Sequence, residues 1–264
     1  MLSEVLTFIF FTLIGLEIRQ GLQNPKEAIL PAISALGGML FPALIFLALV
    51  PGSKAWAVAM PTDVALAIGA LSILGNRVNP AVRLYLLTLA VADDFFSLVA
   101  IGIFFRNDLH LSSAIYTLGA AALGAVLPAR DNLITILSPI ATYLIIPIYI
   151  TINLLAHLDF SVSQEKISIA VVVARVAGKV LGITLFTYLC IKFTQLRLPR
   201  NLELKEVVGI GFLAGMGLTV SIVIAQISLH SPAELAQVRM GLFFAALLSG
   251  LCGLLWLKRF PASL

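Results

Sequence analysis

Apolar runs of about twenty residues recur along the chain, and this pattern limits what the chain can fold into. A helix rises about 1.5 Å per residue, so some twenty residues cross a hydrocarbon core roughly 30 Å thick. Turn-forming pairs such as Asn24-Pro25 and Pro51-Gly52 separate the runs. We therefore expect an all-α polytopic membrane protein with one transmembrane domain. Nine spans are predicted, at approximately 5–18, 27–50, 55–76, 81–105, 112–127, 133–156, 166–191, 207–229 and 235–257.

Composition excludes several other classes of protein. The chain is 60% hydrophobic and only 11% charged, which is not typical of a soluble domain. Membrane β-strands alternate apolar and polar residues, whereas these runs are continuously apolar. The basic residues form no continuous face, so we expect no nucleic-acid partner. Cys190 and Cys252 lie in or at the end of apolar runs, which favours packing roles over a disulfide or a zinc site. We expect no cofactor and no enzymatic activity.

Lysine and arginine are unevenly divided between alternate connections. One side collects eleven of them and the other side four. Cytoplasmic loops carry the excess, so the C-terminus is expected in the cytoplasm of a bacterial-type inner membrane. The same count puts Met1 outside, which predicts that a first helix is missing before it. The eleven are Arg19, Lys26, Arg77, Arg83, Arg130, Lys192, Arg197, Arg200, Lys205, Lys258 and Arg259.

Two adjacent carboxylates, Asp93 and Asp94, lie in the middle of the apolar run 81–105. An aspartate at a helix centre costs about 2.5 to 3.5 kcal/mol to insert, and two neighbours also repel each other. Such a pair is retained where it faces water, an ion or a cationic partner, which predicts an ion or proton pathway. The alternative is a pair of structural acids that bond to neighbouring helices.

Three further ionisable residues lie at membrane depth. Asp63 follows Pro61 and Thr62, and the missing proline donor predicts a locally unwound helix there, with a simple proline kink as the alternative. Lys179 lies in the middle of the span 166–191, where it must pair with a carboxylate or lose its proton, unless it reaches the interface. Arg175, one helical turn earlier, keeps its proton and is expected to be structural or part of an outward-facing mouth.

The span 207–229 contains four glycines in nine residues, among them Gly215 and Gly217, followed by Thr219 and Ser221. Glycines weaken a helix, and hydroxyls can bond the carbonyls that a break releases. This span and the Pro61-Thr62-Asp63 span are the middle members of two triplets, 27–105 and 166–257. The triplets start on opposite sides of the membrane. That pattern predicts inverted-topology repeats with a site where the interrupted helices meet.

Several stretches resemble the NhaA-type sodium/proton antiporters. They are FFTLIGLEIRQGL, PAISALGGMLFPALIF, AMPTDVALAIGALSILGNRV, LYLLTLAVADDFFSLVAIGIFF, GKVLGI and GFLAGMGLTVSIVIA, in this order. Thr-Asp, Asp-Asp and Gly-Lys in three separate spans make a specific combination. This family is itself a type case of inverted-repeat transporters, so the repeat pattern is not independent support for the resemblance.

The resemblance implies a role for each matching residue. Asp94 would be the principal ligand of the transported Na+, with Asp93 beside it and engaging Lys179. Thr62 and Asp63 would lie in the unwound span, where Asp63 balances the helix ends that meet there. Glu17 would lie in a cytoplasmic funnel. The implied partners are Na+ and H+ as substrates, the lipid bilayer and a second copy of the chain in a homodimer.

The chain also departs from that family. Members have twelve spans, whereas this sequence predicts nine, without the first helix, its hairpin and about two central spans between Asn107 and Pro128. Around 129–138 the only charges are Arg130 and Asp131, so the family's acidic and histidine-containing pH-sensing cluster is not matched.

The functional hypothesis is secondary active exchange of Na+ or Li+ for H+. Carboxylates bind a hard cation only when they are ionised, so the cation and the protons compete for the aspartates. Three alternatives stay open. They are a sodium-coupled organic anion transporter, for which Arg175 is the only anion-binding candidate, an inactive shortened paralogue, and an intramembrane aspartyl protease. The protease is disfavoured because its two aspartates must face each other from different helices, whereas adjacent residues diverge by about 100°.

Overall fold

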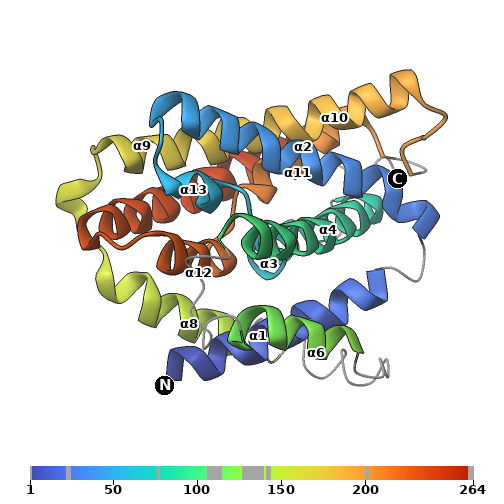
Figure 1. The fold of residues 1–264 in the computed structure, drawn as a ribbon. Coiled ribbons are helices and arrows are strands. Elements are labelled where there is room, and N and C mark those ends of the chain that lie inside the picture. The colour runs from blue at the N-terminus through green and yellow to red at the C-terminus, as the bar shows by residue number, and fades with distance from the viewer. Residues whose placement is uncertain are drawn as a thin grey trace.

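The computed structural model describes residues 2–21, 25–75, 78–105, 115–126, 140, 144–199 and 202–260. Every regular element in these ranges is helical, and no strand occurs within them. The prediction of an all-α membrane protein is confirmed (Figure 1). Helices satisfy their own backbone hydrogen bonds, which is the condition for crossing lipid.

Within the described residues, five helical segments are long and apolar enough to cross a membrane, and a bent pair makes a sixth. All six coincide with predicted spans. The five are α2 (Pro25–Leu49), η1 (Lys54–Ala59) with α3 (Val64–Ser72), α4 (Pro80–Phe104), α9 (Lys166–Val173) with η7 (Ala174–Gly178) and α10 (Lys179–Phe193), and α13 (Pro232–Arg259). The bent pair is α11 (Leu204–Ala214) and α12 (Thr219–Ser228).

The other three predicted spans correspond to shorter apolar helices. The span 5–18 corresponds to α1 (Leu2–Gly21). The spans 112–127 and 133–156 lie partly outside the described residues. They contain η3 (Ile115–Gly119) with α6 (Ala120–Val126), and α8 (Ile146–Asn153), respectively. Two short turns, η5 (Leu155–His157) and η6 (Phe160–Val162), lead from α8 to α9.

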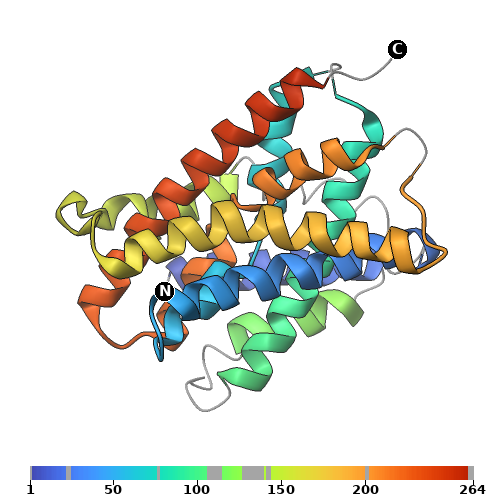
Figure 2. The same ribbon diagram turned by 90° about the horizontal axis from the view of Figure 1, so that it is seen from above.

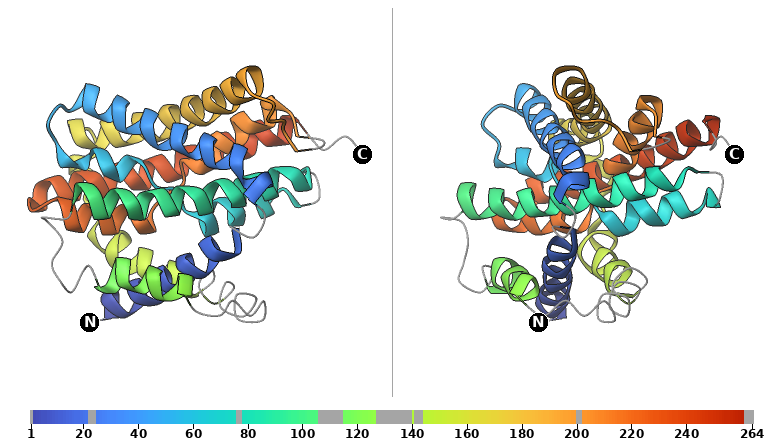
Figure 3. Two further views of the ribbon diagram at one scale, coloured as in Figure 1. Left: turned by 45° about the vertical axis from the view of Figure 1, so that its right-hand side comes forward. Right: turned by 90° about the vertical axis from the view of Figure 1, so that its right-hand side faces the viewer.

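The helices form two layers. In Figure 1 and in both views of Figure 3, α1, α6 and α8 lie together beneath the remaining helices. We call these three helices the lower layer and the remaining helices, α2, η1, α3, α4 and α9 to α13, the bundle. From above (Figure 2), α2 and the α9–α10 helix run alongside each other and α13 crosses them obliquely. All the interrupted or bent segments belong to the bundle.

Close helix contact holds α2 against α10. Gly37 and Gly182 face each other so closely that a Cβ atom on either would overlap the carbonyl of the other. In the lower layer, Gly15 of α1 and Gly124 of α6 make the same kind of approach to the backbone of the partner helix. Small residues at helix contacts are typical of membrane bundles, where van der Waals packing drives helix association.

The helices are apolar on their outward faces as well. Ile103 on α4 is 61% exposed, Leu181 on α10 53% and Leu255 on α13 60%. In a soluble protein this much apolar surface would be costly, whereas in a bilayer it is the surface that lipid requires. The multi-pass membrane class therefore follows from the exposed faces as well as from helix length.

Candidate functional site

The first interruption lies between η1 and α3, where residues 61–63 are not helical. Pro61 cannot donate a backbone hydrogen bond, and Asp63 has an extended backbone, with φ −104° and ψ 105°. The Asp63 side chain caps α3, because its Oδ1 accepts from the Leu66 amide at 3.3 Å. The Thr62 hydroxyl donates to the carbonyl of Ala214 at 3.0 Å. This interruption is thus bonded to the last residue of α11.

The second interruption separates α11 from α12, which are bent by 50° relative to each other. Thr219 opens α12 and contacts Asp63 across the bundle. Its hydroxyl donates to Asp63 Oδ2 at 2.9 Å, and its amide lies 3.4 Å from the same oxygen. One carboxylate therefore lies at the N-termini of α3 and α12. Helix N-termini carry partial positive charge, so both helix ends can interact favourably with this carboxylate.

Lys179 pairs with Asp93 inside the bundle. Its Nζ lies 3.1 Å from Asp93 Oδ2 and donates to the Thr62 hydroxyl at 2.9 Å. Lys179 and Asp93 are both fully buried. The pair therefore connects α10, α4 and the first interruption without contact with solvent.

Arg175 bonds to backbone carbonyls from both interrupted spans. It lies in the π-helical turn η7, is fully buried, and donates to the carbonyls of Val58 at 2.6 Å, Pro61 at 2.6 Å and Gly215 at 3.1 Å. A fourth bond goes to the Ser221 hydroxyl at 2.9 Å. These carbonyls would otherwise be left unpaired where the helices end. Of the two options that we expected for Arg175, these contacts favour the structural one, which stays a prediction.

The glycines of the second interruption leave room for Arg175. A Cβ atom on Gly217 would overlap both the Arg175 guanidinium and the Pro61 carbonyl. Gly215 supplies one of the carbonyls that Arg175 binds, and a Cβ there would overlap the Ser249 side chain. The glycine-rich motif therefore allows an arginine and two broken spans to meet at one point.

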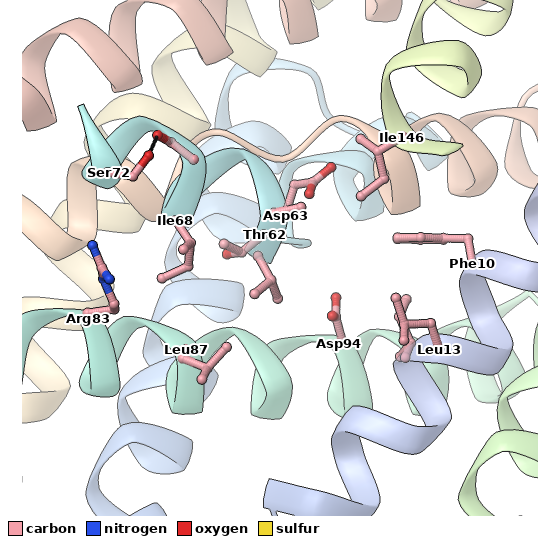
Figure 4. A pocket seen from close by; sticks show the side chains of 14 residues that line it. Phe10, Leu13, Thr62, Asp63, Ile68, Ser72, Arg83, Leu87, Asp94 and Ile146 are labelled. Carbon is pink, nitrogen blue, oxygen red and sulfur yellow. Dashed lines mark hydrogen bonds between the residues drawn. The ribbon is translucent and has the colours of Figure 1, made fainter. Parts of the chain in front are cut away.

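A cavity of about 270 Å³ lies between the bundle and the lower layer. Asp63, which caps α3, and Asp94 of α4 line the wall that the bundle forms. Phe10 and Leu13 of α1 line the wall that the lower layer forms (Figure 4). Asp63 is 3% exposed and Asp94 4%. The remaining lining residues are Ile14, Thr62, Val64, Ala65, Ile68, Gly69, Ser72, Arg83, Leu87 and Ile146.

The two adjacent aspartates face different surroundings. Asp94 lines the cavity, whereas Asp93 points at Lys179 and is not among the residues that line the cavity. This divergence is what a helix imposes, because successive residues are turned by about 100°. The resemblance implied that Asp93 lies beside Asp94 and engages Lys179, and the ion pair with Lys179 is present. The aspartate that lines the cavity together with Asp94 is Asp63, and the ligand role of Asp93 stays a prediction.

The structure therefore brings together the predicted residues Thr62, Asp63, Asp93, Lys179 and Thr219 through hydrogen bonds, and it places Asp94 on the cavity that Thr62 and Asp63 also line. Glu17 lies on α1, but its side chain is outside the described part. Sequence reasoning overlooked Arg83 at the rim of the cavity and two amides at membrane depth, Asn153 and Gln226. All three were visible as polar residues within or at the start of apolar runs.

Among the described residues, no group of three or more His, Cys, Asp or Glu side chains could hold a metal ion. A cation at Asp94 would therefore need further oxygen ligands. Hydroxyls, backbone carbonyls and water are the ligands that hard cations accept. The Thr62 hydroxyl lines the same cavity.

A helical membrane bundle with buried acids and cations at two interrupted spans is typical of a polytopic ion transporter. The model of the family Na+/H+ antiporter 1 matches residues 1–136 and 127–257. The chain therefore belongs to that family.

Similar proteins from three bacteria carry the name Na+/H+ antiporter NhaA. NhaA 2 of Aliarcobacter butzleri is 28% identical, over 96% of this chain and 80% of that protein. The NhaA proteins of Shewanella frigidimarina and Salmonella arizonae are also 28% identical, over 98% and 97% of this chain and 81% and 82% of theirs. The first alignment has 318 positions against 264 residues in this chain, so the relative has internal segments that this chain lacks.

Proposed function

We propose that this protein exchanges Na+ or Li+ for H+ at Asp94, with Asp63 as the second carboxylate of the same site. The observation that carries the proposal is the cavity that reaches both acids at mid-bundle and continues to the exposed residues Ser72 and Arg83. A buried carboxylate that a solvent path reaches can exchange a proton for a cation. A carboxylate sealed in the core cannot.

Charge balance supports competition between one cation and protons. The site contains three aspartates and two cationic side chains, so with every group ionised it carries one net negative charge. Buried charge that is not neutralised is costly, and either a proton or a monovalent cation neutralises it. Binding a hard cation requires an ionised carboxylate, so cation entry expels protons.

Four of these five ionisable groups have distinct roles in the proposed exchange, and the fifth, Arg175, is structural. Asp94 faces the cavity and takes part in exchange. Asp63 lies at the N-termini of α3 and α12, whose partial positive charge it meets. Asp93 and Lys179 form a buried pair that responds when the charge on Asp94 changes, because the two aspartates are neighbours on one helix.

The orientation and repeats inferred from the sequence belong to the same proposal. The cavity rim at Ser72 and Arg83 lies on the side that the charge count assigns to the cytoplasm, together with the C-terminus. The triplets 27–105 and 166–257 each carry one interrupted span, as inverted repeats require. Location in a bacterial-type inner membrane and assembly as a homodimer stay predictions.

The organic-anion alternative required Arg175 to face the cavity. Arg175 is fully buried, uses its guanidinium on three carbonyls and one hydroxyl, and is not among the residues that line the cavity. The inactive-paralogue alternative expects decay of the contacts between spans. Instead, Thr62, Asp63 and Lys179 keep mutually compatible hydrogen bonds.

The test is the variant Asp94→Asn in proteoliposomes, with proton movement followed by an internal pH-sensitive dye after Na+ or Li+ is added. The amide cannot carry the negative charge that the cation needs, so we expect exchange to fall to the level of protein-free liposomes. The matched control is Asp159→Asn, because Asp159 is a surface aspartate bonded only locally, to Ser161. Unchanged exchange in Asp94→Asn would refute the site.

A further inference from the structure

The bundle and the lower layer are packed differently on the two sides of Asp63. One apolar cluster joins the layers, with Phe11 and Ile14 of α1 and Ile150 of α8 grouped with Val220 and Val223 of α12. We call this cluster the seam. The second cluster contains residues of the bundle and, among the described residues, none of α1, α6 or α8. The layers are thus sealed together around α12, and the cavity separates them near α3 and the start of α4.

A polar bridge crosses the layers at the seam. Gln226 of α12 donates from Nε2 to Oδ1 of Asn153 on α8 at 3.2 Å. Asn153 is 7% exposed, and its own Nδ2 donates to the Tyr149 carbonyl at 3.0 Å, which orients the amide. Gln226 is exposed. An exposed partner can exchange the bond for water at little cost, so the bridge can form and break.

The bridge lies on the far side of Asp63 from the cavity rim. Thr219 bonds Asp63 at the start of α12, and Gln226 lies seven residues further along the same helix. That separation is two turns, about 10 Å. The cavity reaches the seam at Ile146, the first residue of α8, and Asn153 is the last residue of the same helix. Its exposed lining residues Ser72 and Arg83 lie at the other end of the cavity, on α3 and α4 (Figure 4). Asp63 and Asp94 therefore face an open path on one side and the bridged seam on the other.

We infer that Asn153 and Gln226 are positioning residues that hold this second path closed. The site reaches the opposite face of the membrane only when their hydrogen bond breaks and α12 separates from α8. The inference rests on the proposed exchange function, since a transporter must open its site to each side in turn. A hydrogen bond with an exposed partner, over an apolar seam, suits a contact that forms and breaks in every cycle.

The test is a reversible cross-link in a chain in which Cys190 and Cys252 are replaced by alanine. Cysteines at Asn153→Cys and Gln226→Cys are joined by a short bis-methanethiosulfonate reagent and released by reductant. We expect the rate of Na+-driven proton exchange to be at least tenfold lower in the cross-linked protein and to recover on reduction. Na+ should still bind from the open side, and this binding is measured as thermal stabilisation of the cross-linked protein in detergent.

A matched pair within the bundle is the control. The Ser168 hydroxyl of α9 donates to the backbone carbonyl of Gln237 on α13 at 2.8 Å, and both helices belong to the bundle. Cross-linking Ser168→Cys to Gln237→Cys should leave exchange unchanged. If exchange is undiminished after the cysteines at positions 153 and 226 are cross-linked, the proposed gate is wrong. Absence of exchange before any cross-linking instead contradicts the proposed function.

A second variant tests the gate without a cross-link. Gln226→Ala removes the bridge, so the seam should open more often. We expect a Val223→Cys thiol, buried in the seam, to react several-fold faster with a membrane-impermeant maleimide added on the side away from the cavity rim. An unchanged labelling rate contradicts the role of Gln226.

Discussion

Two buried cations one turn apart have different partners. Lys179 binds a carboxylate and a hydroxyl, whereas Arg175 binds three carbonyls at helix ends and one hydroxyl. The guanidinium presents five donors in a rigid plane and keeps its proton, so its bonds do not depend on pH. Lysine has one nitrogen and can lose its proton when buried. Arginine therefore suits a structural cation whose charge is fixed, and lysine suits a cation that can change its protonation.

Arg175→Lys should therefore destabilise the protein although it keeps the charge. A single ammonium cannot reach carbonyls from Val58, Pro61 and Gly215 together, and each buried acceptor left unpaired costs about 1 to 3 kcal/mol. We expect a clearly lower unfolding temperature in detergent, measured by intrinsic fluorescence. Arg197→Lys, at an exposed position, is the control and should not shift it. Equal unfolding temperatures for the two variants would mean that the carbonyl contacts contribute nothing.

At the scale of elements, close contact between α2 and α10 fixes the position of the helix that carries Lys179. Gly37 and Gly182 allow the backbones to touch, and Gly38 packs on the Ile183 side chain one residue further along α10. Ser34, Tyr85 and Thr187 form a buried triangle of hydroxyls, with separations of 2.7 to 3.0 Å, that adds α4 to the same contact. The helices that bear Asp93 and Lys179 are thus bonded to each other two turns from the ion pair.

Gly182→Ala should push α2 and α10 apart. The new methyl group would overlap the Gly37 carbonyl, and overpacking of this kind costs typically 1 to 3 kcal/mol. We expect a lower unfolding temperature and a raised Na+ concentration for half-maximal exchange. The control is Gly102→Ala in α4, where a Cβ meets, among the described residues, only the Leu118 side chain, at 3.7 Å. That variant should be neutral or stabilising by up to about 1 kcal/mol, from helix propensity alone. If Gly182→Ala changes neither the unfolding temperature nor the Na+ dependence, this contact does not hold the two helices together.

At the scale of the whole molecule, the proposed exchange site between the two layers would link cation binding to stability. A ligand that binds only the folded state stabilises it by RT ln(1 + [L]/Kd), about 2.7 kcal/mol at a hundredfold excess over Kd. Protons compete for the same carboxylates, so the stabilisation by Na+ should grow as the pH rises and more of the site is ionised.

The corresponding measurement is the unfolding temperature in detergent as Na+ replaces choline at constant ionic strength. We expect a rise at alkaline pH that shrinks at acidic pH and is absent in Asp94→Asn. Choline is too large for the site and tests general salt effects. If the unfolding temperature rises by the same amount at every pH, or still rises in Asp94→Asn, Na+ does not bind at the proposed carboxylates.

The apolar runs alone determined the class of protein and the positions of most spans, because a bilayer of fixed thickness sets how many apolar residues a helix needs. The cost of burying charge also marked Asp63, Asp94 and Lys179 as functional candidates before any partner was known. Both inferences depend on energies that act on each segment separately.

Only the tertiary structure decided which groups meet. The pair of Asp93 with Lys179 was implied by the family resemblance but not by the residues themselves. Adjacency on a helix could not show that Asp63, rather than Asp93, lines the cavity with Asp94. The partners of Arg175 are mostly backbone carbonyls, which every residue possesses and no motif reveals. The bridge between Asn153 and Gln226 joins residues 73 positions apart. Contacts between separate spans depend on how the helices pack against one another, and that packing is a property of the assembled chain.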